Sequence, residues 1–373
     1  MWIVAPLALA VVGVLAYGLF QGADALLIAK NKTGKPVDVN DVIKTAVTVI
    51  TLIGAVLAGV YAYRKQRLTE GDSRRADASQ LADRYSTAAE QLGHEQAAVR
   101  LAGVYAMARL ADDWPEQRQV CIDVLCAYLR MPYETNRDAN GFKTGEREVR
   151  HTIIRVIRDH LRDPEAPTTW CGLNLDFTGA TFDGGDFSGA KFRGSEVTFF
   201  GAKFTSGRVA FFGAQFAGGE VDFGYAQFRG GGIDFRAAQF TGCRVSFFGA
   251  KFRGSEVTFN TAQFTGGEVD FRAAEFRGGE VHFGYAGFTG GEVTFNAARF
   301  TGGTVSFSGA VGFGGAEFTG GEVTFNTAQF TGGTVTFNGA EFTGGTVTFN
   351  GVRVASASSI DWGPFPVIPP NVP

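Results

Sequence analysis

The sequence predicts a mainly β protein, a four-sided β-helix (solenoid) preceded by a helical segment and two transmembrane helices. Two observations carry this prediction. Phenylalanine recurs with a fixed twelve-residue period between about Leu173 and Val352, and two stretches near the N-terminus each run for nineteen residues without a charge. A period of this kind indicates a solenoid, because each unit can bury its apolar face only against its neighbours.

The two uncharged stretches predict a membrane anchor over residues 1–67. Residues 2–20 and 45–63 are each long enough to span the hydrocarbon core as a helix. For residues 2–20 the alternative is a cleaved signal peptide, but no Lys or Arg precedes the apolar run, and the run is long for a signal. Four Lys lie between the stretches and five basic residues follow the second, so the positive-inside rule places the bulk of the chain in the cytoplasm.

Residues 68–165 have helical patterns. The charged, Ala-rich residues 70–92 indicate an exposed helix, and apolar residues at helical spacing over 97–111 indicate a second one. The segment Asp112-Asp-Trp-Pro115 ends that helix and begins another, which runs to about residue 130. A polar loop at 131–145 precedes a last helix over 146–162. We expect this helix, with Trp170, to cap the open end of the solenoid, where Phe rings and strand edges need cover.

The repeated unit, over 171–355, reads A-x-F-x-G-G-x-V-x-F-x-x. The alternation in V-x-F and A-x-F is typical of extended chain with one face buried, and the Gly pairs suit tight corners. Twelve residues are too few to close around two Phe rings, so we expect a coil of twenty-four residues with four sides. About seven coils stacked at the strand spacing make a rod roughly 35 Å long. In such a coil Phe204 stacks on Phe228 and Phe252, while Phe216 lies across the core.

Four five-residue units at the start of the repeat resemble the pentapeptide-repeat family. They are Leu175-Asp-Phe-Thr-Gly, Ala180-Thr-Phe-Asp-Gly, Gly185-Asp-Phe-Ser-Gly and Ala190-Lys-Phe-Arg-Gly. The resemblance implies a right-handed quadrilateral β-helix with the central Phe inside. This chain departs from the family pattern in using Phe at nearly every central site and in adding two residues to alternate units, which implies wider or bulged corners.

The helical segment carries a second, shorter resemblance. Ala98-Val-Arg-Leu-Ala102 and Ala108-Arg-Leu-Ala111 are similar to HEAT- or armadillo-type helical hairpins. Similar segments precede pentapeptide repeats in bacterial membrane proteins, so the two resemblances together imply a multi-pass protein of the bacterial cell membrane.

Two places depart from the regular repeat. Six extra residues at Val311–Ala316 separate Phe307 from Phe318. They either add a side, which rotates all later units by a quarter turn, or bulge outward; we favour the added side, because an exposed Val and Phe would forfeit apolar burial. The Pro-rich residues 356–373 end the repeat, and we expect Trp362 and Phe365 to cover its last turn.

The sequence contains no recognisable catalytic, metal-binding or cofactor-binding pattern, so we expect no enzyme and no cofactor. Its four His stand apart, at positions 94, 151, 160 and 282. The four Cys (121, 126, 171 and 243) have no metal-ligand or disulfide spacing and are expected to be free, mostly buried thiols, which suits a reducing compartment.

Two exposed features are candidate interaction sites. The residues Arg229, Arg253 and Arg277 lie twenty-four apart and should stack on one edge of the rod. The alternative for this edge is a solvated surface balanced locally by Glu256 and Glu280. The second feature is a set of rings that follow an inward Phe and should point outward: Phe200, Phe212 and Phe248. They either pack in the corners or contact a partner.

Together these features predict a non-enzymatic, membrane-tethered interaction or scaffold protein with an unknown protein partner and no nucleic acid. The alternative is a DNA mimic, since some pentapeptide-repeat proteins resemble duplex DNA and bind a type II topoisomerase. Residues 171–352 contain sixteen acidic and twelve basic residues, a net charge of 12 − 16 = −4. That modest charge and the Arg edge disfavour a mimic.

Overall fold

The computed structural model describes residues 13–14, 17–18, 21, 39–194, 196–308, 315–355 and 360–363. The chain forms two compact units, Met1–Ala82 and Asp83–Pro373. Most of the first predicted membrane span (2–20), most of the loop after it, and Phe365 lie outside the described residues.

One long helix, α2 (Val39–Leu92), accounts for the second predicted span and for the exposed helix predicted at 70–92. Its segment Val47–Leu68 has a mean hydropathy of 1.6, and none of it is buried against other parts of the protein. Within the described residues this is the one helix long and apolar enough to cross a membrane, by length and composition. The helix is continuous because Arg, Lys, Gln, Leu and Glu, all good helix formers, dominate the junction at 64–70.

Three helices precede the repeat in the second unit, close to the predicted bounds. They are α3 (Ala97–Asp113), α4 (Arg118–Arg130) and α5 (Glu146–His160), with a 3-10 turn at Pro115–Gln117 before α4. Their shared core is apolar, with Met107, Leu125 and Ile153 fully buried. The HEAT resemblance of this segment stays a prediction.

A buried charge cluster ties these helices together. Glu146, at the start of α5, pairs with Arg100 of α3 at 3.3 Å and with Arg150 of α5 at 3.1 Å. It also accepts a hydrogen bond from the Tyr128 hydroxyl of α4 at 2.9 Å. Because all four groups are nearly inaccessible to water, removal of one partner would leave a buried charge or donor unpaired, which typically costs several kcal/mol.

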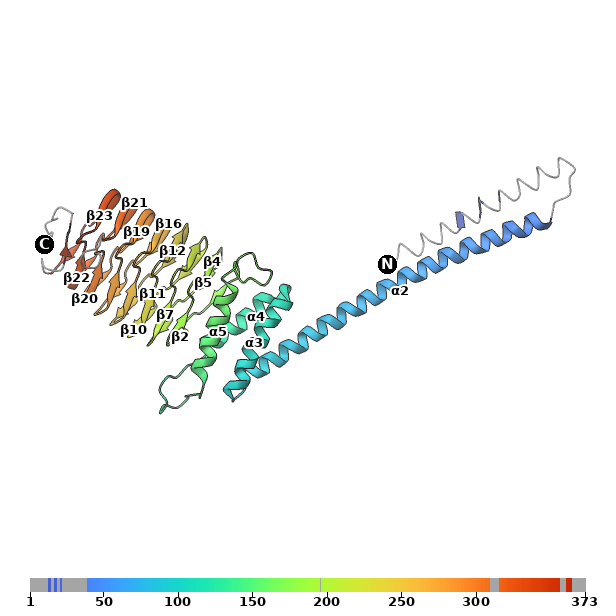
Figure 1. The fold of residues 1–373 in the computed structure, drawn as a ribbon, viewed down its shortest axis with the longest axis horizontal. Helices are drawn as coiled ribbons and strands as arrows, with labels where there is room; N and C mark the ends of the chain where they lie inside the picture. Colours follow the sequence, from blue (N-terminus) through green and yellow to red (C-terminus); the bar gives the residue numbers. More distant parts are fainter. Residues whose placement is uncertain are drawn as a thin grey trace. The chain divides into compact units, whose positions relative to one another are not determined.

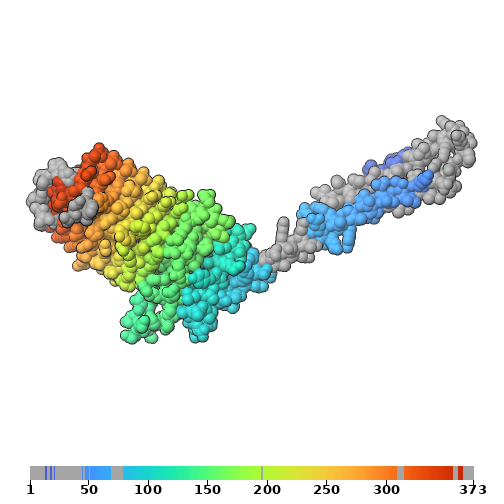
Figure 2. Space-filling view, in the orientation of Figure 1, coloured from blue at the N-terminus to red at the C-terminus, as the bar shows by residue number. Residues whose placement is uncertain are grey.

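The repeat forms a coil of about seven turns built from parallel strands, which Figure 1 shows stacked from green to red and Figure 2 shows in space-filling form. Each turn contributes one strand to each of four columns, here called faces 1 to 4 in chain order. The short strands of face 1 are β1 (Leu175–Asp176), β5 (Glu196–Thr198), β9 (Glu220–Asp222) and β13 (Cys243–Ser246). Those of face 2 are β2 (Thr181–Phe182), β6 (Lys203–Phe204), β10 (Gln227–Arg229), β14 (Lys251–Arg253), β17 (Glu275–Phe276) and β24 (Arg353–Val354).

Face 3 consists of β3 (Gly185–Asp186), β7 (Arg208–Ala210), β11 (Gly232–Asp234), β15 (Glu256–Thr258), β18 (Glu280–His282) and β25 (Ile360–Asp361). Face 4 begins with β4 (Lys191–Arg193), β8 (Gln215–Ala217) and β12 (Gln239–Thr241). Later strands run around a Gly-Gly corner and serve two faces each. Faces 4 and 1 share β16 (Gln263–Asp270), β19 (Gly287–Thr294), β21 (Glu317–Thr324) and β23 (Glu341–Thr348); faces 2 and 3 share β20 (Arg299–Ser306) and β22 (Gln329–Thr336).

The twenty-four-residue coil is confirmed by the strand register. Phe228 pairs with Phe204 in one neighbouring strand and with Phe252 in the other, and the ring centroids are 4.8 and 4.7 Å apart. Phe216 belongs to face 4, where it pairs with Phe192 and Phe240. Each face contributes one such column of buried, face-to-face rings. Rings of the opposite faces 1 and 3 meet edge to face across the core, which is a favoured geometry for crossed aromatic pairs.

The corners alternate between two types. At the F-x-x-A corners the Ala N–H donates to the carbonyl of the Phe three residues earlier, as Ala226 does to Phe223 at 3.0 Å. At the Gly-Gly corners the second Gly has a positive φ in many turns, and a Cβ on Gly267 (φ 85°) would collide with the backbone of Cys243 in the adjacent turn. Any other residue there would face both the strained backbone and the collision.

The prediction that the insertion adds a side and rotates later units is wrong. Across it Phe288 pairs with Phe318 and Phe300 with Phe330, thirty residues apart, so every face continues in the same column. Gly315 and Ala316 take the usual corner positions, since Ala316 donates to the Phe307 carbonyl at 2.8 Å. A quarter turn would have stacked Gly-Gly corners on F-x-x-A corners and broken the hydrogen-bond ladder. The extra residues, 309–314, lie outside the described residues.

Both ends of the coil are covered. Figure 1 shows α5 beside the first strands, and Ile154 of α5 packs so close to Gly185 of β3 that a Cβ there would lie 2.9 Å from it. The predicted Trp170 is fully buried and stacks on His160 at 4.2 Å. At the other end Trp362 packs against Phe349 at 4.9 Å, and β25 pairs with β22.

The four cysteines are free, as expected. Cys121, Cys126 and Cys243 are buried and Cys171 is half-buried. Burial raises the pKa of the Cys121 and Cys243 thiols to about 11 and that of Cys126 to about 12. These thiols therefore stay protonated and unreactive at neutral pH.

Candidate interaction surface

The three predicted Arg lie in one row on face 2. Arg229 and Arg253 are register partners in β10 and β14, and Arg277 follows β17, its N–H donating to the Phe252 carbonyl at 2.8 Å. Arg229 and Arg277 are exposed and Arg253 is half-buried. Neighbouring Arg at the strand spacing repel by roughly 1 kcal/mol or less in water.

The carboxylates that lie nearest to the row in the sequence do not neutralise its positive charge. Glu256 and Glu280 start strands of face 3, and neither forms an ion pair with the row among the described residues. The one acidic neighbour is Glu275, which lies 3.8 Å from Arg253 and 3.1 Å from Arg299. Within the described residues Arg229 and Arg277 have no carboxylate within ion-pair distance, so two of the three charges face solvent.

The structure enlarges the Arg row to a basic face. The residue before each inward Phe of face 2 also points outward, and at this position β6, β14 and β20 carry Lys203, Lys251 and Arg299. Over the five turns from β6 to β20 they give, with the Arg row, six basic residues and one acidic residue, Glu275. The sequence holds a weak signal for the enlargement, since positions 203, 227, 251, 275 and 299 are also twenty-four apart, but their residues vary among Lys, Gln, Glu and Arg. We call Lys203, Arg229, Lys251, Arg253, Arg277 and Arg299 the basic face.

Face 1 is acidic by contrast. A row of Glu occupies the residue before each inward Val, interrupted by Arg244, which lies between Glu220 and Glu268 in register: Glu196, Glu220, Glu268, Glu292 and Glu322. Partial burial, together with the charges of Glu268 and Glu322, raises the pKa of Glu292. Adjacent sides of the coil thus carry opposite charge.

The three predicted outward aromatics are exposed: Phe200, Phe212 and Phe248 are 43%, 50% and 38% accessible. Phe200 and Phe248 lie on the corner between faces 1 and 2. Between them is Tyr225, 48% exposed, which meets Phe200 at 5.4 Å and Phe248 at 5.6 Å, both edge to face. Tyr225 was not predicted, because it stands one residue later in its unit than the Phe residues do.

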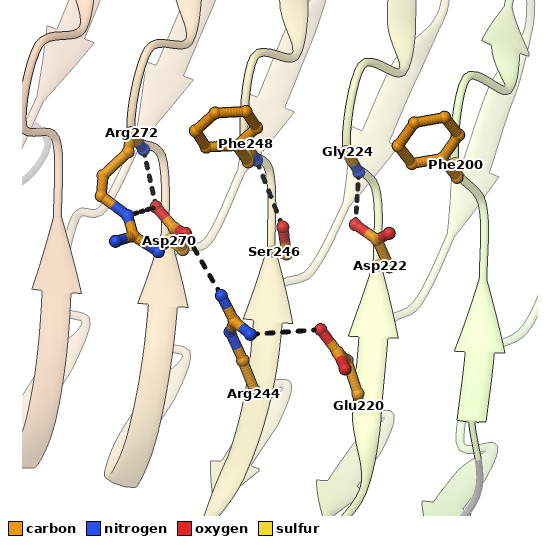
Figure 3. Close-up of a pocket in the computed structure, with 9 residues that line it drawn as sticks. All are labelled: Phe200, Glu220, Asp222, Gly224, Arg244, Ser246, Phe248, Asp270 and Arg272. Atoms are coloured by element: carbon orange, nitrogen blue, oxygen red, sulfur yellow. Dashed lines mark hydrogen bonds and ion pairs between the residues drawn. The ribbon is translucent and has the colours of Figure 1, made fainter.

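A hollow of about 360 Å³ opens beside this aromatic corner on face 1. Figure 3 shows the Phe200 and Phe248 rings on either side of Gly224, with Asp222 below. Arg244 crosses the neighbouring strands and reaches Glu220 at 3.6 Å and Asp270 at 3.8 Å.

The described residues contain no group of three His, Cys, Asp or Glu side chains that could hold a metal ion. Three of the His residues lie beside single carboxylates: His151 beside Asp183, His160 beside Asp112 and His282 beside Glu280. His151 and His160 belong to α5 and His282 belongs to β18.

The described coil, its five-residue units at the start and its stacked central Phe residues now identify the family. The family model "Pentapeptide repeats (8 copies)" matches residues 174–205. The chain is a pentapeptide-repeat protein. Its twelve-residue units after residue 205 lie beyond the matched segment, although the strand columns continue through them without a break.

No curated protein matches this pentapeptide-repeat chain. Among solved structures, that of QnrB1, a plasmid-mediated fluoroquinolone resistance protein, in trypsin-treated form, matches with 16% identity and a TM-score of 0.12. The match covers 50% of this chain and 84% of the QnrB1 chain.

Proposed function

We propose that this pentapeptide-repeat protein is a non-enzymatic, membrane-tethered interaction module whose basic face docks an acidic surface of a protein partner. The observation that carries the proposal is the segregation of charge on a rigid coil. Over the five turns from β6 to β20, six basic residues gather on face 2 with one acidic neighbour, while the adjacent face 1 carries five Glu. Stacking like charges has an electrostatic cost that a partner of opposite charge offsets, and such patches also steer association.

The coil suits a docking role because its buried inner side chains leave the backbone little conformational freedom. The Phe columns are buried, and the strands between the first and the last turns are paired on both sides. A partner therefore meets a preformed surface, with little ordering cost on this side of the interface.

The tether is part of the same proposal. The unburied apolar segment Val47–Leu68 supports one membrane span. A second span over 2–20, with both termini and the coil in the cytoplasm of a bacterium, completes the arrangement. The four free thiols, of which three are buried and Cys171 is half-buried, fit a reducing compartment.

The alternative, a DNA mimic that binds a type II topoisomerase, requires a surface of phosphate-like negative charge. The basic face covers five consecutive turns on one side of this coil, which disfavours that function. Affinity capture from detergent-solubilised bacterial membranes, followed by mass spectrometry, separates the two. Recovery of gyrase subunits would favour the mimic, and recovery of membrane or signalling proteins with acidic surfaces would favour the scaffold.

A further inference from the structure

Among the twelve-residue units, two corners of the coil hold an arginine against an aspartate, and a third corner has the aspartate without the arginine. In Asp234-Phe-Arg236 and Asp270-Phe-Arg272 the Arg lies two residues after the Asp. In Asp222-Phe-Gly224 the same position is Gly. The three Asp all follow an inward Val or Ile by one residue, so they occupy equivalent places in the repeat.

The two occupied corners show how the coil binds a guanidinium group. Arg236 donates from Nε to Asp234 Oδ1 at 2.9 Å and from Nη2 to Oδ2 at 2.7 Å. Arg272 forms the same pair with Asp270, at 2.9 and 2.6 Å. The Arg236 guanidinium also lies over the ring of Phe212, 5.9 Å from its centroid, twenty-four residues earlier. A bidentate carboxylate and an aromatic ring from the turn before thus form the site.

The third corner keeps every part of this site except the guanidinium. Gly224 N–H donates to Asp222 Oδ1 at 2.7 Å, as Arg236 N–H does to Asp234 at 3.0 Å, so the carboxylate is held in the same way. Phe200, twenty-four residues before Gly224, takes the place of Phe212. The hollow described above lies here, between the Phe200 and Phe248 rings (Figure 3).

The charge at Asp222 is also left without a partner. Asp234 has a second cation in Arg208 at 3.2 Å, and Asp270 has one in Arg244 at 3.8 Å. In the part of the chain that the structure describes, no Lys, Arg or His reaches Asp222 within 4 Å. Arg244, the nearest cation along face 1, is engaged by Glu220, Glu268 and Asp270.

We propose that the hollow at Gly224 binds the guanidinium group of an arginine side chain on the protein partner. The partner's arginine would pair with Asp222 and stack on Phe200, as Arg236 does with Asp234 and Phe212. Lysine fits less well, because its point charge cannot form the bidentate pair. This inference rests on the proposed interaction function and gives the partner a second recognition element, on the side of the aromatic corner away from the basic face.

Saturation-transfer NMR on the full chain in detergent tests the site with three small probes: the amides of N-acetyl-arginine, N-acetyl-citrulline and N-acetyl-lysine. Citrulline has the shape of arginine without its charge. We expect the arginine probe to bind at least about tenfold more tightly than citrulline, as one bidentate charged pair implies. Empty micelles measure the background.

Two variants should abolish the arginine preference. Asp222→Asn removes the charge but can still accept the Gly224 N–H, so the corner is kept. Gly224→Arg fills the hollow from within the chain, and the φ of Gly224 is not left-handed. A Cβ there would lie 2.8 Å from Asp222 Oδ1 and 3.2 Å from the Phe200 ring, so the carboxylate and the ring must both shift slightly. Gly284→Arg is the matched control. Gly284 also precedes a Tyr at a corner, but the residue two positions before it is His282, whereas the residue two positions before Gly224 is Asp222.

Equal binding of arginine and citrulline to the wild-type chain would overturn the site, and so would an arginine preference that survives in folded Asp222→Asn protein. If the wild-type chain captures a protein partner but shows no arginine preference, this inference fails and the proposed function stands. An arginine preference in a chain that captures no protein would overturn the proposed function instead.

Discussion

Replacing one ring of the Phe core tests the stacking at its strongest point. Phe252 is fully buried on face 2, between Phe228 at 4.7 Å and Phe276 at 4.8 Å. It also contacts Phe247 and Phe271 of the neighbouring column at 6.2 and 6.3 Å. Phe252→Ala removes a ring that buries roughly 150 Å² or more, worth about 4 kcal/mol at 25 cal/mol per Å². The rings above and below are held by their own strands, so the cavity cannot collapse, and we expect a loss of about 3–5 kcal/mol.

Hydrogen exchange on the full chain in detergent measures this loss where it occurs. A solenoid is stabilised by contacts between adjacent turns, so protection should fall in β10, β14 and β17 and much less in distant turns. Phe212→Ala is the matched control: this ring is half-exposed, and its removal should cost less than about 1 kcal/mol. A loss below about 1 kcal/mol for Phe252→Ala, or a fall in protection centred on the strands of Phe240 and Phe264, would refute the twenty-four-residue coil.

Three further predictions concern other parts of the chain. Deleting residues 309–314 leaves Phe307-Ser308-Gly315-Ala316, an ordinary corner, so thermal unfolding should change little; a collapse of stability would mean that these residues form an essential side. The second concerns Asp183, which lies beside His151, Tyr133 and Arg147. Burial alone would raise the pKa of Asp183, but hydrogen bonds from His151 and Tyr133 and the charges of His151 and Arg147 outweigh burial, so the pKa is lowered. Because a lowered carboxyl pKa stabilises above the unfolded pKa, Asp183→Asn should destabilise the protein at pH 7 and lose that effect as the pH falls below about 4; a pH-independent effect would contradict this. For the tether, a Cys at Gly34 should react with an impermeant thiol reagent in intact cells and one at Gly71 should not, and the reverse labelling would overturn the topology.

The repeat was predictable because its inner positions obey one rule. Each inward Phe needs a neighbour of the same size above and below it, so Phe204, Phe228 and Phe252 recur at the coil length, and that length can be read from their spacing. The caps were predictable for a similar reason: Trp170 and Trp362 are large apolar residues at the two ends of a rod whose rings would otherwise face water.

Other features of the coil depend on contacts between turns that the spacing of residues in the sequence does not reveal. An inward pattern at Val311 and Phe313 suggested an added side, but the ladder and corner types of the adjacent turns decide the register, as the Ala316 N–H to Phe307 bond shows. The basic face was only partly foreseen, because outward residues such as Lys203 and Lys251 alternate with Gln227 and Glu275. The hollow at Gly224 was not foreseen. It can be recognised only by comparing three corners in the structure: Asp234 and Asp270 each pair with an arginine, and Asp222 does not.

The basic face as the docking surface is the central claim, and quantitative partner capture tests it most directly. The wild-type chain is compared with a variant in which Arg229, Arg253 and Arg277 are replaced by Thr, the residue found at Thr205 and Thr301 of the same column. The control replaces three exposed Arg of the helical segment, Arg109, Arg137 and Arg162, which gives the same change in net charge. We predict that capture falls at least about tenfold for the coil variant and is unchanged for the control. Unchanged capture by the coil variant, with equal or higher thermal stability, would show that the face is only a solvated surface.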